Sequence, residues 1–225
     1  MKDSHAALSH GFPLRLMLMA EDNLLCVAKR KFVVTTDSEH GLRVYPNLAG
    51  SMVLSGINQL WVADITYVRL EEEFVYLAVV LDAHSRRVIG WNLEDTLAGS
   101  LTMAALRMAL EQRQVQAGLV HHSDRGVQYA SGEYTQLPTD HQITISMSRK
   151  GNPWDNAACE SFMKTLKSEE VYRTEYRDKA DARSRIGEFP ERVYNEKRLH
   201  SALHYVSPNN YERRLTSSRP CQEVG

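Results

Sequence analysis

The stretch SRKGNPWDNAACESFMKTLK, residues 148–167, combines a polar loop with the beginning of an amphipathic helix. Pro153 restricts the backbone of the residue before it, and Asp155 or Asn156 can cap the free amides of the first helical turn. Apolar residues then recur at the spacing of one helical face. They are Cys159, Phe162, Met163 and Leu166. We expect this stripe to hold the helix against the core of the protein.

Charged side chains occupy the adjacent face of the same helix. At about 100° per residue, Lys164 and Lys167 lie on the same face as Glu160. Two interpretations are open. An ordinary Glu–Lys pair on a solvated surface stabilises a helix by about 0.2–0.5 kcal/mol. Alternatively, one carboxylate and two ammonium groups project together into a functional site.

Length and composition are those of a globular chain. The 225 residues, 43% of them hydrophobic and 24% charged, can form one domain with appendages. The formal net charge of −1 is not basic, so nucleic-acid binding would depend on local clusters of lysine and arginine. Three separated cysteines without a CxxC pair favour a reducing cytoplasm over a disulfide framework or zinc knuckle. Pro13 and Arg15 break the apolar patch at 12–20, so we expect neither a signal peptide nor a membrane span.

The order of the expected elements is typical of an α/β protein. We expect a partial N-terminal helical and basic arm with a linker over 1–56, a core over 57–170 and a helical C-terminal extension over 171–225. Within the core, strands are expected at 60–68, 74–81, 88–91, 119–123 and 143–145, and the first three form an antiparallel meander. Helices are expected at 98–113, after Ser131 with an end or kink near Pro138, after 155, and from Ser207–Pro208.

Acidic residues stand at distinctive points in this order. Asp64 lies inside an apolar strand, where a carboxylate is costly unless it is hydrogen-bonded, paired or bound to a metal. Asp124 follows the strand at 119–123, at the edge where sites of α/β sheets are built. Asp82 precedes a polar turn, so we assign it a structural capping role. His200 and His204 stand four residues apart, but no further ligand motif lies near them, which argues against zinc.

If the first and fourth strands are neighbours, Asp64 and Asp124 converge and Glu160 reaches them from its helix. Three carboxylates that close repel one another and imply divalent cations. Two such ions about 4 Å apart can promote displacement at a phosphodiester. Lys164 and Lys167 would then meet the phosphates.

Several blocks of the chain resemble the signature blocks of bacterial insertion-sequence transposases of the OrfB type, with a retroviral-integrase-like catalytic core. They are WVADITY at 61–67, HSDRGVQY at 122–129, KGNPWDNA at 150–157 with Glu160, and a tail with Tyr194, Asn195, Arg198, His200, Leu203 and Ser207–Pro208. The 35 residues between Asp124 and Glu160 match the spacing of that group's DD(35)E triad.

The resemblance implies an RNase H-like fold, a mixed five-stranded sheet flanked by helices. It implies Mg²⁺ or Mn²⁺, with two ions expected, held by Asp64, Asp124 and Glu160. Family members cut DNA at the element's end and use the freed 3′ hydroxyl to attack another phosphodiester. The implied partners are transposon-end and target DNA, further copies of the chain, and an OrfA-type helix-turn-helix subunit, in the bacterial cytoplasm. Lys150 and Asn152, in the loop beside Glu160, would contact DNA or remain solvated.

The chain also departs from the family pattern. Against the pattern that the resemblance implies, the basic segment before Leu24 is expected to be shortened, Pro138 falls where a helix is expected, Gln142 stands in place of a usual glycine, and Pro190 interrupts the helix expected before Tyr194. An alternative function is therefore an inactive remnant that binds DNA or transposase subunits. A general nuclease of the same fold lacks support, because the flanking blocks match transposases. Two tryptophans, Trp61 and Trp154, are assigned to packing.

Overall fold

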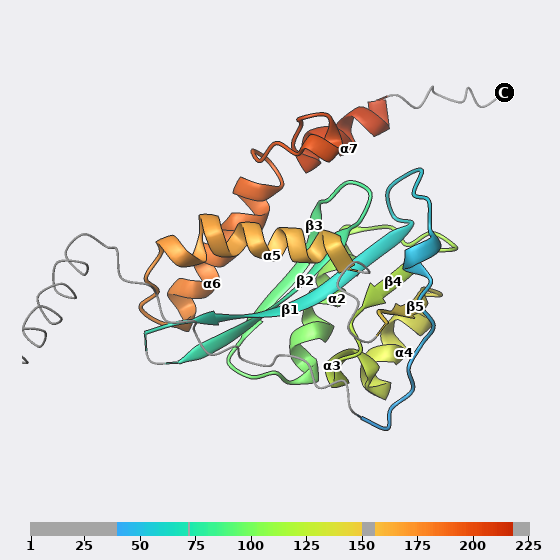
Figure 1. Ribbon diagram of the computed structural model, residues 1–225, viewed down its shortest axis with the longest axis horizontal. Coiled ribbons are helices and arrows are strands. Elements are labelled where there is room, and N and C mark those ends of the chain that lie inside the picture. The colour runs from blue at the N-terminus through green and yellow to red at the C-terminus, as the bar shows by residue number, and fades with distance from the viewer. Residues whose placement is uncertain (1–39, 72, 150–155, 218–225) are drawn as a thin grey trace, which may run out of the picture. The chain divides into compact units, whose positions relative to one another are not determined.

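A mixed five-stranded sheet forms the centre of the fold (Figure 1). The computed structural model describes residues 40–71, 73–149 and 156–217. The strands are β1 Leu60–Arg69, β2 Phe74–Asp82, β3 Val88–Glu94, β4 Val120–Ser123 and β5 Thr144–Met147, in the order β3-β2-β1-β4-β5. Strands β1 to β3 are antiparallel, whereas β4 is parallel to both β1 and β5. The predicted meander and the predicted five-stranded α/β sheet are confirmed.

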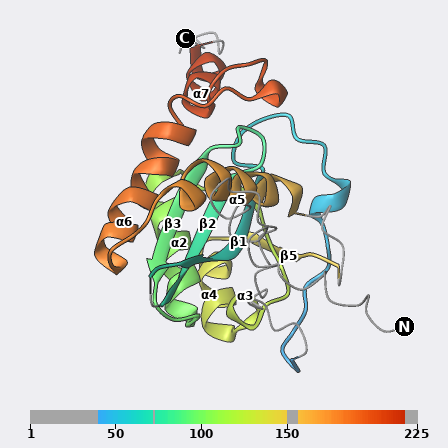
Figure 2. The same cartoon turned by 60° about the vertical axis from the view of Figure 1, so that its left-hand side comes forward.

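Helices cover both faces of this sheet (Figure 2). They are α2 Gly99–Gln112, α3 Val127–Ala130, α4 Gly132–Asp140, α5 Ala157–Glu169, α6 Lys179–Glu188 and α7 Pro208–Ser217. Short 3-10 turns are η1 Ala49–Ser51, η3 Val171–Arg173 and η5 Ser201–Leu203, and a π-helical turn, η4, covers Phe189–Tyr194. The short helix α3 was not expected from the sequence. Among the described residues, no helix is both long enough and apolar enough to cross a membrane.

The alternation of β1 side chains divides the core into two layers, because successive strand residues point to opposite faces. Trp61, Ala63 and Ile65 pack with residues of α2, α3 and α4. Leu60 and Val62 instead pack in a second cluster with residues of α5, α6 and the π-helical turn. Asp64 has the parity of Val62, so it faces the α5 layer. Trp61 is fully buried, which confirms its predicted packing role.

The C-terminal extension shares the core of the sheet. Phe162 of α5, Phe189 and Tyr194 form a ring cluster in which the Phe162 and Tyr194 centroids lie 4.8 Å apart. Pro190 has no N–H to continue the α-helical ladder, and the chain adopts π-helical bonding there, with the Asn195 N–H donating to the Pro190 oxygen at 3.0 Å. The predicted interruption at Pro190 is confirmed, and the turn carries Tyr194 into the core.

The predicted end of the helix near Pro138 is also confirmed, since α4 stops at Asp140. The Ser131 hydroxyl caps α4 by accepting the Tyr134 N–H, as predicted. Gln142 follows with φ of 58°, a left-handed conformation that glycine adopts without steric cost. The departure from glycine at this position therefore places backbone strain directly before β5.

Residues 1–39 of the expected N-terminal helical and basic arm, Trp154 and the Asp155 cap lie outside the described residues. The boundaries predicted at 56 and 170 remain predictions.

Candidate active site

The parallel pairing of β1 with β4 brings two aspartates to neighbouring positions. Val62 lies opposite His122 in this register. Two residues further along each chain come Asp64, in β1, and Asp124, directly after β4. Neighbouring strands lie about 4.8 Å apart. The expected proximity of the first and fourth strands is confirmed, and the charge of Asp124 acts on Asp64.

Two side-chain hydrogen bonds fasten the start of α5 to β1. The Asn156 amide donates to the Ala63 oxygen at 3.0 Å, and the Cys159 thiol donates to the Val62 oxygen at 3.4 Å. Asn156 makes no side-chain cap, so the proposed capping role of Asn156 is wrong. Its amide is used between elements because β1 offers backbone oxygens directly beneath it. These anchors place Glu160, exposed in the first turn of α5, above Asp64.

The pKa of Asp64 is shifted by burial and by the charged groups around it. Burial, and next the negative charge of Asp124, raise its pKa to about 7. The Ile65 N–H, which donates to the Asp64 carboxylate at 2.9 Å, opposes this shift. The charge of Glu160 raises the pKa further, whereas Lys167 lowers it. The site therefore has an excess of negative charge, which favours a proton or a cation at Asp64.

The two lysines of α5 have different environments. Lys164 is exposed, whereas Lys167 is half-buried with its Nζ 4.8 Å from the centre of the Tyr67 ring. Burial lowers the pKa of Lys167, and the nearby Asp64 charge opposes that shift. Lys167 thus points toward the sheet while Lys164 points to solvent. Lys150 and Asn152 lie outside the described residues.

The loop after β4 is held by contacts that the sequence did not reveal. Asp124 accepts the Gly126 N–H at 2.8 Å, and Arg125 donates to the Ser148 oxygen at 2.6 Å. The His122 ring lies between the hydroxyls of Ser146 and Ser148, at 2.8 and 3.1 Å. Alternation along β4 and β5 was the signal that could have placed these side chains on one face.

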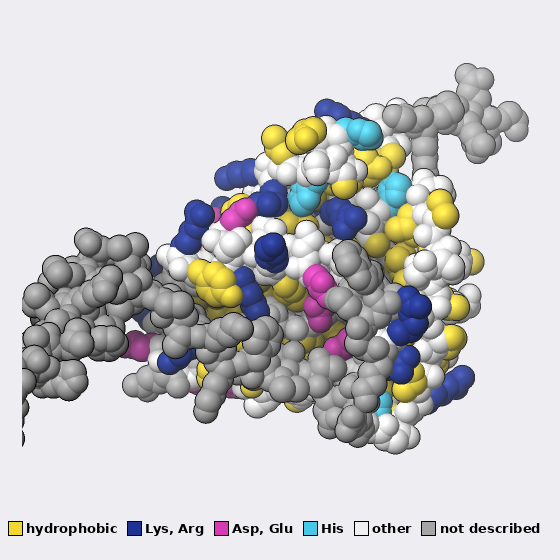
Figure 3. Space-filling view, in the orientation of Figure 1, with side chains coloured by type: hydrophobic (Ala, Val, Ile, Leu, Met, Phe, Trp, Pro, Cys, Tyr) yellow, Lys and Arg dark blue, Asp and Glu magenta, His cyan; other side chains and the backbone are white. Residues whose placement is uncertain are grey.

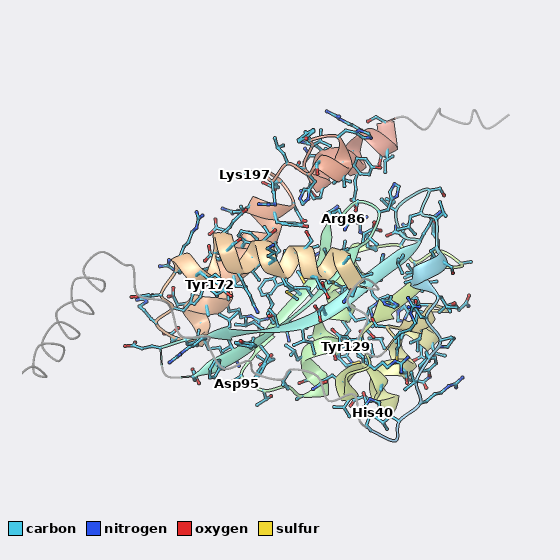
Figure 4. The ribbon with its side chains drawn as sticks, viewed as in Figure 1. His40, Arg86, Asp95, Tyr129, Tyr172 and Lys197 are labelled. Carbon is cyan, nitrogen blue, oxygen red and sulfur yellow. The ribbon has the colours of Figure 1, made fainter. Side chains whose placement is uncertain are left out.

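Tyr129 is a second residue that sequence reasoning missed. It is buried, and its hydroxyl has no hydrogen-bond partner among the described residues. Burial raises its pKa, followed by the influence of Tyr134 and then of Asp124. The charges of Asp124 and Asp64 both raise the pKa of the Tyr129 phenol, so this residue, labelled in Figure 4, lies within electrostatic reach of the two aspartates.

Asp82, the other acid at the end of a core strand, has the structural role that the sequence predicted. Asp82 is fully buried and accepts backbone N–H groups from Asn58, His84 and Ser85 at 2.6, 3.0 and 2.9 Å.

In the C-terminal region, the His200 ring packs edge-on against Tyr194 at 4.8 Å. Across the described ranges, no group of three or more His, Cys, Asp and Glu side chains is arranged to hold a metal ion.

Comparison with known proteins shows which family models and solved structures this fold resembles. Two models described as integrase core domain match residues 55–153 and 141–208. The catalytic core of BIV integrase superposes with a TM-score of 0.53 at 18% identity, covering 72% of this chain and 99% of that one. The HTLV-2 integrase catalytic core, solved in complex with magnesium, superposes with a TM-score of 0.51 at 15% identity, covering 68% and 95%. The sheet and its helices define an RNase H-like fold of the retroviral integrase class.

Proteins with similar sequences show to which family within this fold class the chain belongs. An uncharacterized 31 kDa protein of insertion element IS600 from Shigella sonnei is 42% identical over 192 residues, 85% of this chain and 71% of the relative. Transposase InsF of insertion sequence IS3A from Escherichia coli K12 is 37% identical over 209 residues, 91% of this chain and 73% of the relative. The chain belongs to the bacterial insertion-sequence transposases with an integrase core domain. This family consists of polynucleotidyl transferases that carry out transposition and DNA integration.

Proposed function

We propose that this chain is the catalytic subunit of a transposase that cleaves and joins DNA strands through Asp64, Asp124 and Glu160. The observation that carries the proposal is the closeness of the first two acids, Asp64 in β1 and Asp124 directly after the adjacent parallel strand β4. The Asn156 and Cys159 contacts with β1 support the assignment of Glu160 as the third acid. The negative charges of Asp124 and Glu160 both raise the pKa of Asp64, which indicates that the three acids lie near one another.

Magnesium or manganese fits this donor set, because carboxylate oxygens are the ligands that both ions prefer. The raised pKa of Asp64, caused by burial and by Asp124, supports the presence of a positive charge at this position. Closure of the exposed Glu160 side chain on the two aspartates would complete the ligand set. Two bound ions would neutralise charge on the phosphodiester and on the attacking oxygen.

The protein's own residues would hold the substrate. Lys167 lies within electrostatic reach of Asp64, and Lys164 projects from the same helix into solvent. Both would contact phosphates on either side of the reacting group. Lys150 and Asn152 are proposed as further contacts from the loop before α5.

The proposed partners follow from the family. They are transposon-end and target DNA, further copies of the chain on that DNA, and an OrfA-type subunit that supplies end recognition. A bacterial cytoplasmic location accompanies this assignment. The segment 1–56 would connect the core to such partners, and 171–225 would support α5 from behind.

Incubation of the purified chain with a labelled duplex carrying its own element's end tests the proposal. Nicking or strand joining that requires Mg²⁺ or Mn²⁺ is expected, and Glu160→Gln should abolish it. Glu111→Gln, which changes an exposed acid of α2, serves as the matched control and should retain activity.

The alternative is an inactive remnant, favoured by the strained Gln142, by Pro138 inside the last turn of α4 and by the break at Pro190. The assay should therefore be repeated with the OrfA-type subunit added. DNA binding without any cleavage, even in the presence of that subunit, would refute the catalytic proposal and support the remnant.

A further inference from the structure

Two consecutive arginines in the turn between β2 and β3 have different environments. Arg87 donates to the Glu212 carboxylate at 2.8 Å and is used in holding the fold together. Arg86 makes no hydrogen bond or ion pair with any residue that the structure describes, and it is only partly buried. Its φ is 62°, a left-handed conformation that non-glycine residues rarely adopt. A strained residue with an unused guanidinium invites a functional explanation.

The Arg86 side chain faces the junction between α5 and the C-terminal segment, as the labelled residues in Figure 4 show. Burial raises the pKa of the Tyr194 phenol, and the Arg86 charge opposes that shift. The Cys159 thiol, next to Glu160, responds in the same way, with burial and Asp64 raising its pKa and Arg86 opposing them. Arg86 therefore lies beside the first turn of α5, close to the proposed catalytic acids.

A second unused polar group lies in the same place. Burial, followed by the charges of Arg198 and Arg86, lowers the pKa of His200 to about 4. The His200 Nε2 atom is inaccessible to solvent and has no hydrogen-bond partner in the described ranges. The Arg86 guanidinium and the buried His200 Nε2 thus lie at the same junction, and neither has an acceptor among the described residues.

The surrounding surface is rich in positive charge. Figure 3 shows lysine and arginine side chains over the α5 face and the C-terminal segment, around a small acidic area. Lys164 and Lys197 are exposed, and neither forms an ion pair with a described residue. Arg198 is paired with Glu169, and Glu196 is the nearby exposed acid. The positive charge remains local, since the chain as a whole carries a net charge of −1.

We infer that Arg86, assisted by Lys197, forms a phosphate-binding subsite for the DNA strand whose neighbouring phosphodiester reacts at the acids. This inference rests on the proposed function. A guanidinium presents its N–H donors in a planar fork that suits two phosphate oxygens. A strand placed at the acids carries further phosphates along its length, and Arg86 lies where such a phosphate would pass from α5 toward the C-terminal segment.

The test measures binding of a fluorescein-labelled duplex to the full chain by anisotropy over a series of salt concentrations. Arg86→Gln should weaken binding about tenfold at low salt, the scale of one charged hydrogen bond. It should also reduce the slope of log K against log[salt] by about 0.9, corresponding to one phosphate contact. Arg86→Lys should keep the slope but recover only part of the affinity. Arg107→Gln, at an exposed arginine of α2 on the other face of the sheet, is the control and should leave both unchanged.

Arg86→Gly separates binding from folding. Glycine relieves the left-handed backbone, so the melting temperature should not fall below that of Arg86→Gln, while DNA binding is lost to the same extent. Binding by Arg86→Gln and Arg86→Gly with wild-type affinity and slope would overturn the subsite and leave the proposed function intact. An equal loss in Arg107→Gln would also overturn it. A wild-type chain without salt-dependent DNA binding would refute both proposals, whereas Arg86-dependent binding without cleavage, even with the OrfA-type subunit added, would refute catalysis alone.

Discussion

At the scale of single residues, Asn156 and Cys159 determine where α5 begins. Each donates a side-chain hydrogen bond to a backbone oxygen of β1, and the two acceptors, Ala63 and Val62, directly precede Asp64. Glu160 follows Cys159 in the chain, so its position relative to Asp64 depends on these two contacts. A shift of about 1 Å in such a group can cost a hundredfold in rate.

Asn156→Ala should therefore reduce strand cleavage by more than its effect on stability explains. Loss of the bond to Ala63 should lower the free energy of unfolding by about 1 kcal/mol, because one buried hydrogen bond disappears. Urea unfolding and single-turnover cleavage would be measured on the same protein. Ser168→Ala removes an exposed side-chain hydrogen bond near the other end of α5 and should leave cleavage unchanged. Equal cleavage by Asn156→Ala and the wild type would contradict the anchoring role.

At the scale of elements, close packing of α2 on β3 sets the thickness of the layer behind the sheet. A Cβ atom added at Gly90 would lie 2.1 Å from the Ala105 oxygen and 2.9 Å from the Ala109 nitrogen. Both are backbone atoms of α2. Unlike the end of a flexible side chain, they cannot move away without a shift of the whole helix. The helix and the strand can approach this closely only because residue 90 has no side chain.

Gly90→Ala should lower the free energy of unfolding by about 3 kcal/mol, at the upper end of typical overpacking costs, because α2 must move away from the sheet. Thermal and urea unfolding would measure the change. Gly132→Ala is the matched control, since a Cβ there meets no atom within 4 Å and alanine favours the helix. Similar stability losses in the two variants would show that close packing at Gly90 is not the cause.

At the scale of the whole described fold, Glu212 of α7 ties the C-terminal helix to two distant elements. It pairs with Arg87 at 2.8 Å and with Arg113, at the end of α2, at 2.6 Å, and it accepts the Ser85 hydroxyl at 2.6 Å. Burial alone raises the pKa of Glu212, but the Arg113 hydrogen bond and charge outweigh it, with further help from Ser85 and Arg87. The net result is a pKa below the ordinary value.

Glu212→Gln should lower the free energy of unfolding near neutral pH by about 3 kcal/mol, because two arginines lose a buried partner. A depressed pKa stabilises the fold fully above the unfolded-state value of about 4.3, and this contribution disappears as the pH falls through the folded-state value. The stability difference between wild type and variant should therefore shrink in acid. Urea unfolding across that pH range measures it, with Glu111→Gln as control. A pH-independent difference would contradict the ionised state of Glu212.

Local sequence patterns determined the elements and the order of the acids. Alternation and helical spacing depend on neighbours a few residues apart, so the strands, the helix bearing Glu160 and the breaks near Pro138 and Pro190 were all predictable. The family blocks additionally indicated the RNase H-like sheet. Helix α3 was not predicted, because its four residues are too few to show a helical pattern of apolar side chains.

Only the tertiary structure decided which side chains act together. Asn156 contacts a strand residue 93 positions away, and Ser85 meets Glu212 across 127 positions. The same folding uses Arg87 in an ion pair, whereas Arg86 forms none with a residue that the structure describes. A local pattern carries no information on such partners, because hydrogen bonds and charges act over a few ångströms in space. The sequence thus determined the elements and acids of this transposase core, and the packing of distant segments decided how they form a site.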